Sequence, residues 1–194
     1  MKNKIIKTLL LSGLLTSAAF ADMYVGIDYG SASNTDSLKE TPGYFSATQD
    51  NRYGDLGIKI GFGTDGYWKT QFRFSQITYD KAIFDSTHQD LREFDIDFIR
   101  EFEISKNTYP FIKFGLGYGE MDVDGYSESS IGEAYINAGV GLSFKVARHL
   151  YIIGGIDYVY RKWQDIAYNS SYTTYTDSVT GSSTKVYAGV NYKF

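Results

Sequence analysis

The sequence predicts an all-β fold, an eight-stranded antiparallel up-and-down transmembrane β-barrel, from three observations. Eight segments alternate apolar and polar residues, as strands do when one face meets lipid and the other a polar lumen. The connections between these segments are alternately long and short, which is typical of outer loops and inner turns. The chain has 18 Tyr and 20 Gly but only 2 Pro, a balance that favours strands joined by tight turns.

The amino-terminal segment has the pattern of a secretory signal peptide. Three lysines surround the start of an apolar run that reaches residue 15, and small residues lead to an A-x-A end at 19–21. We expect cleavage before Asp22, which divides the chain into a signal peptide at 1–21 and a barrel domain at 22–194. The alternative is a membrane-anchoring helix, but the apolar run is short for ~30 Å of hydrocarbon.

The composition argues against several functions. Three of the 19 Lys and Arg residues lie in the signal peptide, so the mature chain carries 16 basic against 23 acidic residues. Such an acidic chain would be repelled by phosphate backbones, and we expect no nucleic-acid partner. The absence of cysteine excludes disulfides, a thiolate nucleophile and thiolate metal ligands.

In the first half of the chain, alternation predicts strands at 23–30, 55–62, 68–79 and 93–104. The polar stretch 31–51 lacks alternation and is expected to be a long outer loop, with a second such loop at 80–90. The Thr-Asp-Gly at 64–66 supplies the residues of a tight inner turn. Arg100 would face lipid in this register, which predicts either a bulge or a position near the membrane boundary.

In the second half, alternation predicts strands at 112–119, 133–146, 150–161 and 186–194. Short inner turns are expected at 105–108 and 147–149. An acidic outer loop is expected at 120–130 and a Ser/Thr/Tyr-rich one at 164–181. Each strand comes close to the ~9–11 residues that a tilted transmembrane strand requires.

Aromatic residues are expected in two belts at the two water boundaries. The inner belt comprises Phe62, Trp68, Tyr109, Phe144, Tyr192 and Phe194. The outer belt comprises Tyr29, Tyr79, Phe94, Tyr118, Tyr158 and Tyr160. The alternative fold is a soluble, lipocalin-like eight-stranded barrel, which would turn the apolar face inward.

The last nine residues alternate up to an aromatic carboxy-terminus and resemble the β-signal of bacterial outer-membrane barrels, with Gly189 followed by Tyr192 and Phe194. Tyr187 departs from that motif, which usually has a larger polar residue there. With the signal peptide and the strand pattern, the mature chain resembles the small OmpA/OmpX-like outer-membrane β-barrel family. The resemblance implies an outer-membrane location and a monomer inserted by the barrel-assembly machinery among outer-membrane lipids and lipopolysaccharide. It also implies a role in envelope integrity, adhesion or defence rather than catalysis.

Charged residues of both signs occupy the inward positions, where they must pair or hold water because desolvating a lone charge is costly. The inward set comprises Asp28, Lys59, Lys69, Arg73, Asp95, Asp97, Glu101, Glu103, Lys113, Lys145, Asp157 and Arg161. An eight-stranded barrel is just wide enough for side chains to fill, which favours a polar plug over an ion path. Inward glycines either leave water pockets or make room for Lys and Arg side chains.

No catalytic, cofactor or metal site is predicted. The two histidines, His88 and His149, lie in an outer loop and an inner turn, without the spacing of a nucleophile and its base. The third outer loop contains three acids, Asp122, Asp124 and Glu128. They lack the ligand spacing of a calcium-binding EF-hand, but they could bridge through divalent cations to lipopolysaccharide phosphates. The last outer loop, with Tyr168, Tyr172 and Tyr175, is either an adaptable recognition surface or a mobile loop.

The sequence therefore predicts a monomeric, non-enzymatic outer-membrane barrel that acts through its outer loops by adhesion or binding of an unidentified surface ligand. A small passive pore for ions or solutes is the alternative. A lipid-modifying outer-membrane enzyme is the third candidate, because some barrels carry a Ser/His/acid set at the lipid face.

Overall fold

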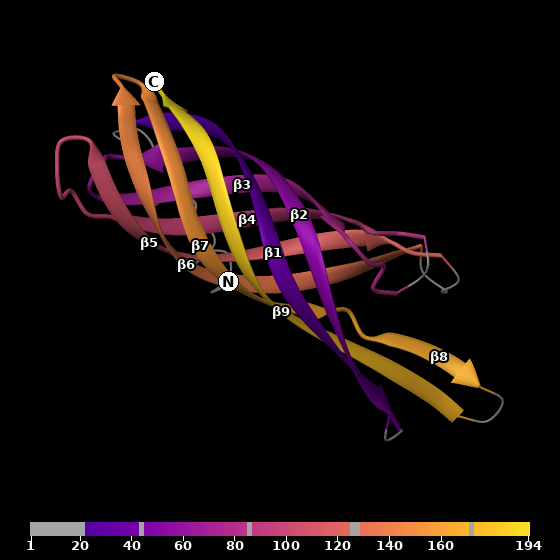
Figure 1. The fold of residues 1–194 in the computed structure, drawn as a ribbon. Helices are drawn as coiled ribbons and strands as arrows, with labels where there is room; N and C mark the ends of the chain where they lie inside the picture. The colour runs from indigo at the N-terminus through magenta and orange to yellow at the C-terminus, as the bar shows by residue number, and fades with distance from the viewer. Residues whose placement is uncertain (1–21, 43–44, 85–86, 125–128, 171–172) are drawn as a thin grey trace, which may run out of the picture.

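The protein is a closed antiparallel β-barrel (Figure 1). The computed structural model describes residues 22–42, 45–84, 87–124, 129–170 and 173–194. Consecutive strands from β1 to β7 pair with one another, β7 pairs with β9, and β9 pairs with β1 to close a ring of eight. The predicted fold class is therefore confirmed. Within the described residues, no helix is long and apolar enough to cross a membrane.

The described strands are longer than the sequence predicted, and one of them lies outside the ring. Their bounds are β1 Met23–Thr41, β2 Ser46–Gly63, β3 Trp68–Tyr79, β4 Asp90–Glu101, β5 Thr108–Asp122, β6 Ser130–Ala147, β7 Leu150–Trp163, β8 Ile166–Ser170 and β9 Thr173–Lys193. The short strand β8 pairs only with β9, in a hairpin beyond the ring.

Side chains alternate between the outside and the inside of the ring along each strand. Outward apolar residues are exposed, with Ile58 at 59% and Val140 at 58% of their maximal accessible area. Inward charged residues are buried, and Asp97 and Arg161 are each 1% exposed. A soluble barrel would show the opposite arrangement, since its core must be apolar. The lipocalin-like alternative is therefore wrong.

Two segments predicted as outer loops are largely strand. Residues 31–41 continue β1, and their ladder with β9 runs without a break to the pair Thr41 and Thr176. Much of 164–181 is likewise strand, in β8 and the first part of β9. The prediction was wrong because it used apolar alternation, which disappears where a strand leaves lipid for water. Backbone pairing does not require apolar side chains, so the strands continue.

The outer ends of β2, β1, β9 and β8 form one projecting sheet in that order. The register joins Ser37 of β1 to Thr48 of β2 on one side and to Thr180 of β9 on the other. Figure 1 shows the β1–β2 hairpin and the β8–β9 hairpin reaching past the barrel together, apart from the outer ends of β4, β5 and β6. We call this four-stranded part the projecting sheet.

Arg100 faces outward from an unbroken ladder, without the bulge that was one of its two predicted explanations. Its guanidinium lies 5.6 Å from the ring centre of Tyr67 and 5.4 Å from that of Phe102. Two belt assignments were wrong, because Tyr79 and Tyr109 are buried inside the barrel. Both have odd numbers in strands whose outward positions are even, so the alternation of their own strands opposes the belt assignment.

Candidate functional site

The interior of the barrel is the densest collection of chemical groups in the described part of the chain. Midway along the barrel, five carboxylates and four cations form a buried set that we call the central charge cluster. Its members are Asp28, Asp55, Asp95, Asp97, Asp157, Lys59, Arg73, Lys113 and Lys185. They come from seven strands, which only the closed ring brings together.

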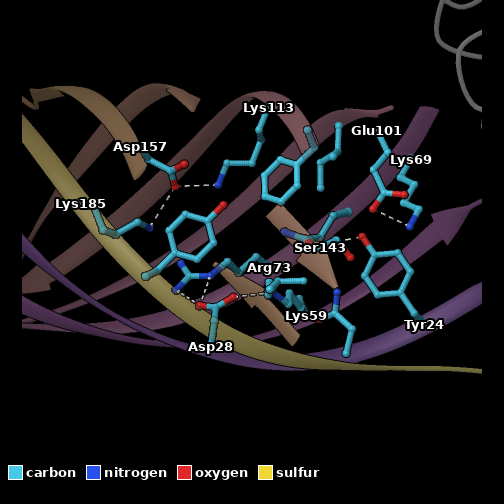
Figure 2. A pocket seen from close by; sticks show the side chains of 16 residues that line it. Tyr24, Asp28, Lys59, Lys69, Arg73, Glu101, Lys113, Ser143, Asp157 and Lys185 are labelled. Atoms are coloured by element: carbon cyan, nitrogen blue, oxygen red, sulfur yellow. Dashed lines mark hydrogen bonds and ion pairs between the residues drawn. The ribbon is translucent and has the colours of Figure 1, made fainter. Parts of the chain in front are cut away.

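Arg73 organises one half of the central charge cluster (Figure 2). Its Nε and Nη2 donate to Asp28 Oδ1 at 3.0 and 2.7 Å, and Nη2 also donates to Asp55 Oδ1 at 2.7 Å. Each of these carboxylates has a second cation, since Lys59 Nζ lies 2.8 Å from Asp28 and Lys185 Nζ lies 2.8 Å from Asp55. Bidentate contact by a planar guanidinium fixes the positions of both acids.

Lys113 organises the other half. Its Nζ donates to Asp157 Oδ2 at 2.7 Å and lies 3.5 Å from Asp97 Oδ2. Lys185 lies between the two halves, with its Nζ 3.8 Å from Asp157 and 2.8 Å from Asp55. The central charge cluster is thus one connected network, in which no cation serves a single acid alone except Lys59.

The central charge cluster has one more carboxylate than it has cations. Neutral hydrogen-bond donors stabilise two of these carboxylates, Asp95 and Asp97. The Tyr135 hydroxyl donates to Asp95 Oδ2 at 2.9 Å. Asp97 accepts from Gln71 Nε2 at 3.0 Å and from Asn137 Nδ2 at 3.1 Å. Such bonds lower the cost of burying these two carboxylates, whose cations are more distant: Arg73 Nη1 lies 3.8 Å from Asp95, and Lys113 Nζ lies 3.5 Å from Asp97. They also fix these side chains against one another across the lumen.

A second group of charges lies nearer the outer end, around Arg161. Its Nη2 lies 2.8 Å from Glu93 Oε1, and its Nε lies 3.3 Å from Glu133 Oε2. Its Nη1 donates to Ser183 Oγ at 2.9 Å and to the Tyr53 hydroxyl at 3.2 Å. The guanidinium therefore crosses the lumen and joins four strands besides its own.

An apolar layer closes the interior beyond Arg161. Its buried members are Ala32, Tyr53, Ile77, Tyr79, Leu91, Met121, Val123, Ile131, Trp163 and Val179. Phe84, from the connection after β3, packs edge to face on Trp163 with ring centres 5.0 Å apart. An ion entering from outside would have to lose much of its hydration to pass these packed side chains, which is costly.

The inner end is held by a third set of ion pairs. Lys69 Nζ lies 2.8 Å from Glu101 and 3.1 Å from Asp65, and Lys193 Nζ lies 3.0 Å from Asp65. The Tyr151 hydroxyl also donates to Asp65. Burial by itself raises the pKa of Asp65, but this hydrogen bond and the two lysines outweigh it and lower the pKa to about 2.

Little space remains between these layers. A cavity of about 30 Å³, lined by Tyr24, Arg73 and Lys113 among others, would hold about one or two water molecules. Inward glycines make room for side chains: a Cβ added at Gly57 would overlap the Arg73 guanidinium, and one at Gly117 would overlap the Tyr135 ring. The inward glycines were predicted either to leave water pockets or to make room for long side chains. The structure favours the second role, and the long side chains include tyrosines.

Most of the residues predicted for the lumen lie in these networks. Asp28, Lys59, Lys69, Arg73, Asp95, Asp97, Glu101, Lys113, Asp157 and Arg161 are all buried there. Lys145 is only half-buried at the inner end, with its Nζ 5.5 Å from the Tyr151 ring centre. Glu103 lies beyond the end of β4 and is exposed, so its inward assignment was wrong.

Four charged members of the central charge cluster and of the Arg161 group were absent from the predicted set: Asp55, Glu93, Glu133 and Lys185. The first three lie on the inward face of predicted strands, and the signal that could have found them is that same alternation. Lys185 was missed because the last strand was predicted to begin one residue later. Lys185 lies two residues before the inward Tyr187, with the outward Val186 between them, so the same alternation places Lys185 on the inward face.

The outer connections hold fewer contacts. Asp122 is exposed and pairs with Arg92 at 3.0 Å, and His88 Nδ1 lies 3.9 Å from Asp124. Among the described residues, no group of His, Asp or Glu has the arrangement of a metal site. Glu128 and Tyr172 lie outside the described residues, as does the predicted signal peptide. Tyr168 and Tyr175 are paired in the β8–β9 ladder.

The predicted assembly signal lies at the inner end of β9, where both neighbouring strands are paired. Tyr192 and Phe194 are exposed on the outside, with ring centres 5.3 Å apart. Gly189 pairs with Asp28 of β1 and Ile153 of β7. His149 Nδ1 lies 2.7 Å from the Lys193 carbonyl oxygen, which connects this end to the turn before β7.

Known barrels share this fold at low sequence identity. Neisserial surface protein A is 19% identical, with a TM-score of 0.56 over 89% of this chain and 97% of its own. OprG from Pseudomonas aeruginosa is 12% identical, with a TM-score of 0.57 over 90% and 96%. The outer membrane protein AlkL is 12% identical, with a TM-score of 0.58 over 90% of each chain. A comparison with curated protein sequences finds no match.

The family comparison covers nearly the whole chain. The profile of the outer membrane protein beta-barrel domain matches residues 8–194. Together with the closed ring of eight strands, the apolar exterior and the charged interior, this match assigns both the family and its cellular location. The chain belongs to the outer membrane protein beta-barrel domain family and is a small eight-stranded barrel of the bacterial outer membrane.

Proposed function

We propose that this protein is a closed barrel that acts through its extracellular end, in surface interaction such as adhesion or in envelope integrity. One observation carries the proposal: the lumen is filled along its length. Ion pairs close the inner end, the central charge cluster and Arg161 fill the middle, and the apolar layer around Trp163 closes the outer end. The groups left free to meet a partner are therefore outside the lumen.

The projecting sheet supports this proposal. β1 and β9 have 19 and 21 residues, about twice what a tilted transmembrane strand requires. A paired backbone presents side chains at fixed positions, which a disordered loop does not, so less conformational entropy is lost on binding.

The small pore is the weaker alternative. Its support is the cavity near Tyr24 and Lys113, together with the charged lining that an ion path requires. At about 30 Å³ the cavity is far smaller than a continuous channel, and the apolar layer lies between it and the outside. Conduction would require several ion pairs and the Phe84 contact with Trp163 to break together.

We further propose that the protein is a monomer without catalytic activity, with outer-membrane lipids and lipopolysaccharide as its partners. The His149 ring nitrogen is engaged by a backbone carbonyl, and His88 lies beside an acid at the outer rim. Neither arrangement has the geometry of a base activating a nucleophile. During biogenesis, the barrel-assembly machinery would recognise Gly189, Tyr192 and Phe194 at the end of β9.

Two measurements on one set of samples test the proposed function. The first is planar-bilayer conductance of the refolded mature chain, for which we expect no steady current. The second is surface attachment of cells that display either the full chain or a variant with residues 166–177 replaced by a short turn. We expect the trimmed variant to keep its heat-modifiable gel mobility and to lose attachment.

Steady, ion-selective conductance steps would overturn the closed-barrel proposal and favour the pore. Attachment that is unchanged after trimming both the β8–β9 hairpin and the outer part of the β1–β2 hairpin would overturn the surface role. The heat shift of each variant serves as the control for folding, because an unfolded chain migrates the same with and without heating.

A further inference from the structure

The outward face of the projecting sheet changes character where the apolar band of the barrel ends. On β1 the outward positions are apolar up to Tyr29 and are then Ser, Ser, Thr and Ser at 31, 33, 35 and 37. On β9 they are Ser, Thr, Ser and Thr at 178, 180, 182 and 184, before the apolar Val186. We call these eight positions the hydroxyl face.

The strand register arranges the hydroxyl face in straight rows. One row joins Arg52 of β2, Ser33 of β1, Thr184 of β9 and Tyr158 of β7. Adjacent strands lie about 4.8 Å apart, so this row is about 14 Å long and places a cation, two hydroxyls and an aromatic ring side by side. Tyr158 is 55% exposed, which leaves its ring and hydroxyl accessible.

The hydroxyls are available for a partner. Thr35 donates to Asp50 Oδ1 at 2.9 Å, and within the described residues no other side chain of the hydroxyl face has a hydrogen bond. All eight positions are exposed or half-exposed. Neutral donors and acceptors at fixed spacing, beside exposed tyrosines, match the alternating hydroxyls and apolar C–H faces of a saccharide.

The charges around the outer rim are divided by side. Beside the hydroxyl face, the outward charged residues of the strands are three cations and one acid: Lys39, Arg52, Lys162 and Asp50. The connections after β3 and β7 add one cation and two acids on this side, Lys81, Asp80 and Asp165, and the backbone of Asp80 bonds to that of Arg52. On the opposite side, across β4 and β5, the outward charged residues are Asp90, Glu120, Asp122 and one cation, Arg92. The hydroxyl side is therefore net positive and suits acidic or phosphorylated sugars, whereas the opposite side would repel them.

We propose that the hydroxyl face binds the saccharide part of lipopolysaccharide in the membrane leaflet that surrounds the barrel. The face continues the lipid-facing band directly above Tyr29 and Val186, and it points sideways from the barrel wall. Sugars attached to the surrounding lipids occupy that position. This inference rests on the proposed outer-membrane surface role and names the partner of one face.

The test compares lipopolysaccharide binding by the refolded barrel in detergent and by three variants of it. S33A/S182A/T184V removes three hydroxyls from the face, and R52M/K162M removes its flanking cations. T78V/S130A removes two hydroxyls that lie outside the hydroxyl face, on β3 and β6, and is the matched control. The probes are lipopolysaccharide with its core oligosaccharide, a truncated form lacking the outer core, and the lipid-free oligosaccharide. Native mass spectrometry gives each Kd, and heat-modifiable mobility confirms that each variant is folded.

We expect the complete lipopolysaccharide to bind at least about tenfold more tightly than either other probe. Loss of three hydrogen bonds should weaken that binding about tenfold or more in the hydroxyl variant, and the control variant should bind like the wild type. Loss of the cations should weaken binding and reduce its salt dependence.

Wild-type affinity in the folded hydroxyl variant would overturn the proposal. So would equal binding of the complete and truncated forms. Equally tight binding of the lipid-free oligosaccharide would overturn the assignment to membrane lipopolysaccharide and indicate a free glycan. Attachment assays on the same variants separate the two proposals. The proposed surface role is tested by trimming the hairpins, and its outcome does not depend on whether the hydroxyl variant binds lipopolysaccharide.

Discussion

Replacing Arg73 with Met tests whether the central charge cluster holds the barrel together. Arg73 is 4% exposed and donates to both Asp28 and Asp55. Methionine fills part of the same space but leaves both carboxylates without their shared guanidinium. Each acid then keeps one cation, Lys59 for Asp28 and Lys185 for Asp55.

The size of the expected loss of stability depends on the cations that remain beside these acids. Removing one partner of a buried ion pair costs about 3–5 kcal/mol, because the other charge stays buried without its counterion. We expect R73M to lower the free energy of unfolding by about 3 kcal/mol, at the low end of that range. Asp28 and Asp55 each keep a cation, and Asp95, which lies 3.8 Å from Arg73, keeps its hydrogen bond from Tyr135. The double variant R73M/D28N should lose less than the sum of its single variants, by about 1–2 kcal/mol.

The assay is urea unfolding of the barrel refolded in lipid, followed by tryptophan fluorescence and by the heat-modifiable gel shift. The matched control is R92M, which breaks an ion pair with Asp122 in which both side chains are more than half exposed. Exposed pairs contribute about 0–1 kcal/mol, so the control should unfold almost like the wild type.

A result in which R73M and R92M destabilise equally would refute the reasoning. It would mean that water reaches the lumen and screens its charges as it does at the surface. An R73M barrel of full stability that also conducts ions would refute the closed-lumen interpretation as well.

Three further predictions address other parts of the structure. G57A should lower the free energy of unfolding by about 1–3 kcal/mol, because its Cβ would displace the Arg73 guanidinium, and a urea titration measures this. The stability contributed by Asp65, whose pKa is lowered to about 2, should be fully present above its usual pKa and lost as pH falls through about 2. The difference in urea midpoint between D65N and the wild type should therefore shrink between about pH 4 and pH 2, and a constant difference would contradict the ion-pair role. F84A should cost about 1–2 kcal/mol through its contact with Trp163 and leave bilayers non-conducting, because the charged layers remain.

The sequence by itself determined the class of fold, the number of strands in the ring and the direction of each face. These features follow from alternation with a period of two, which depends only on the solvent on each side of the sheet. Ile58 and Lys59, for example, are assigned to opposite faces by their neighbours alone, and the structure places them there. The carboxy-terminal motif and the alternation of long and short connections likewise depend on local sequence.

The ends of the strands were decided by tertiary structure. Residues 31–41 contain hardly any apolar alternation, and their extended pairing depends on β9, which lies about 140 residues away in the sequence. Pairing between such distant segments is invisible to a local pattern. The same reason explains Lys185, whose inward position was hidden by the polar, Ser- and Thr-rich stretch before it.

The connections within the lumen were also decided only by the closed ring. Alternation indicates that Arg73 and Asp28 both face inward, but not that they touch, because β1 and β3 are not neighbours in the sheet. Contact across the lumen depends on the diameter of the barrel, on its register and on the room left by Gly57. Sequence alternation determines the direction of a side chain, whereas its partner depends on closure of the barrel.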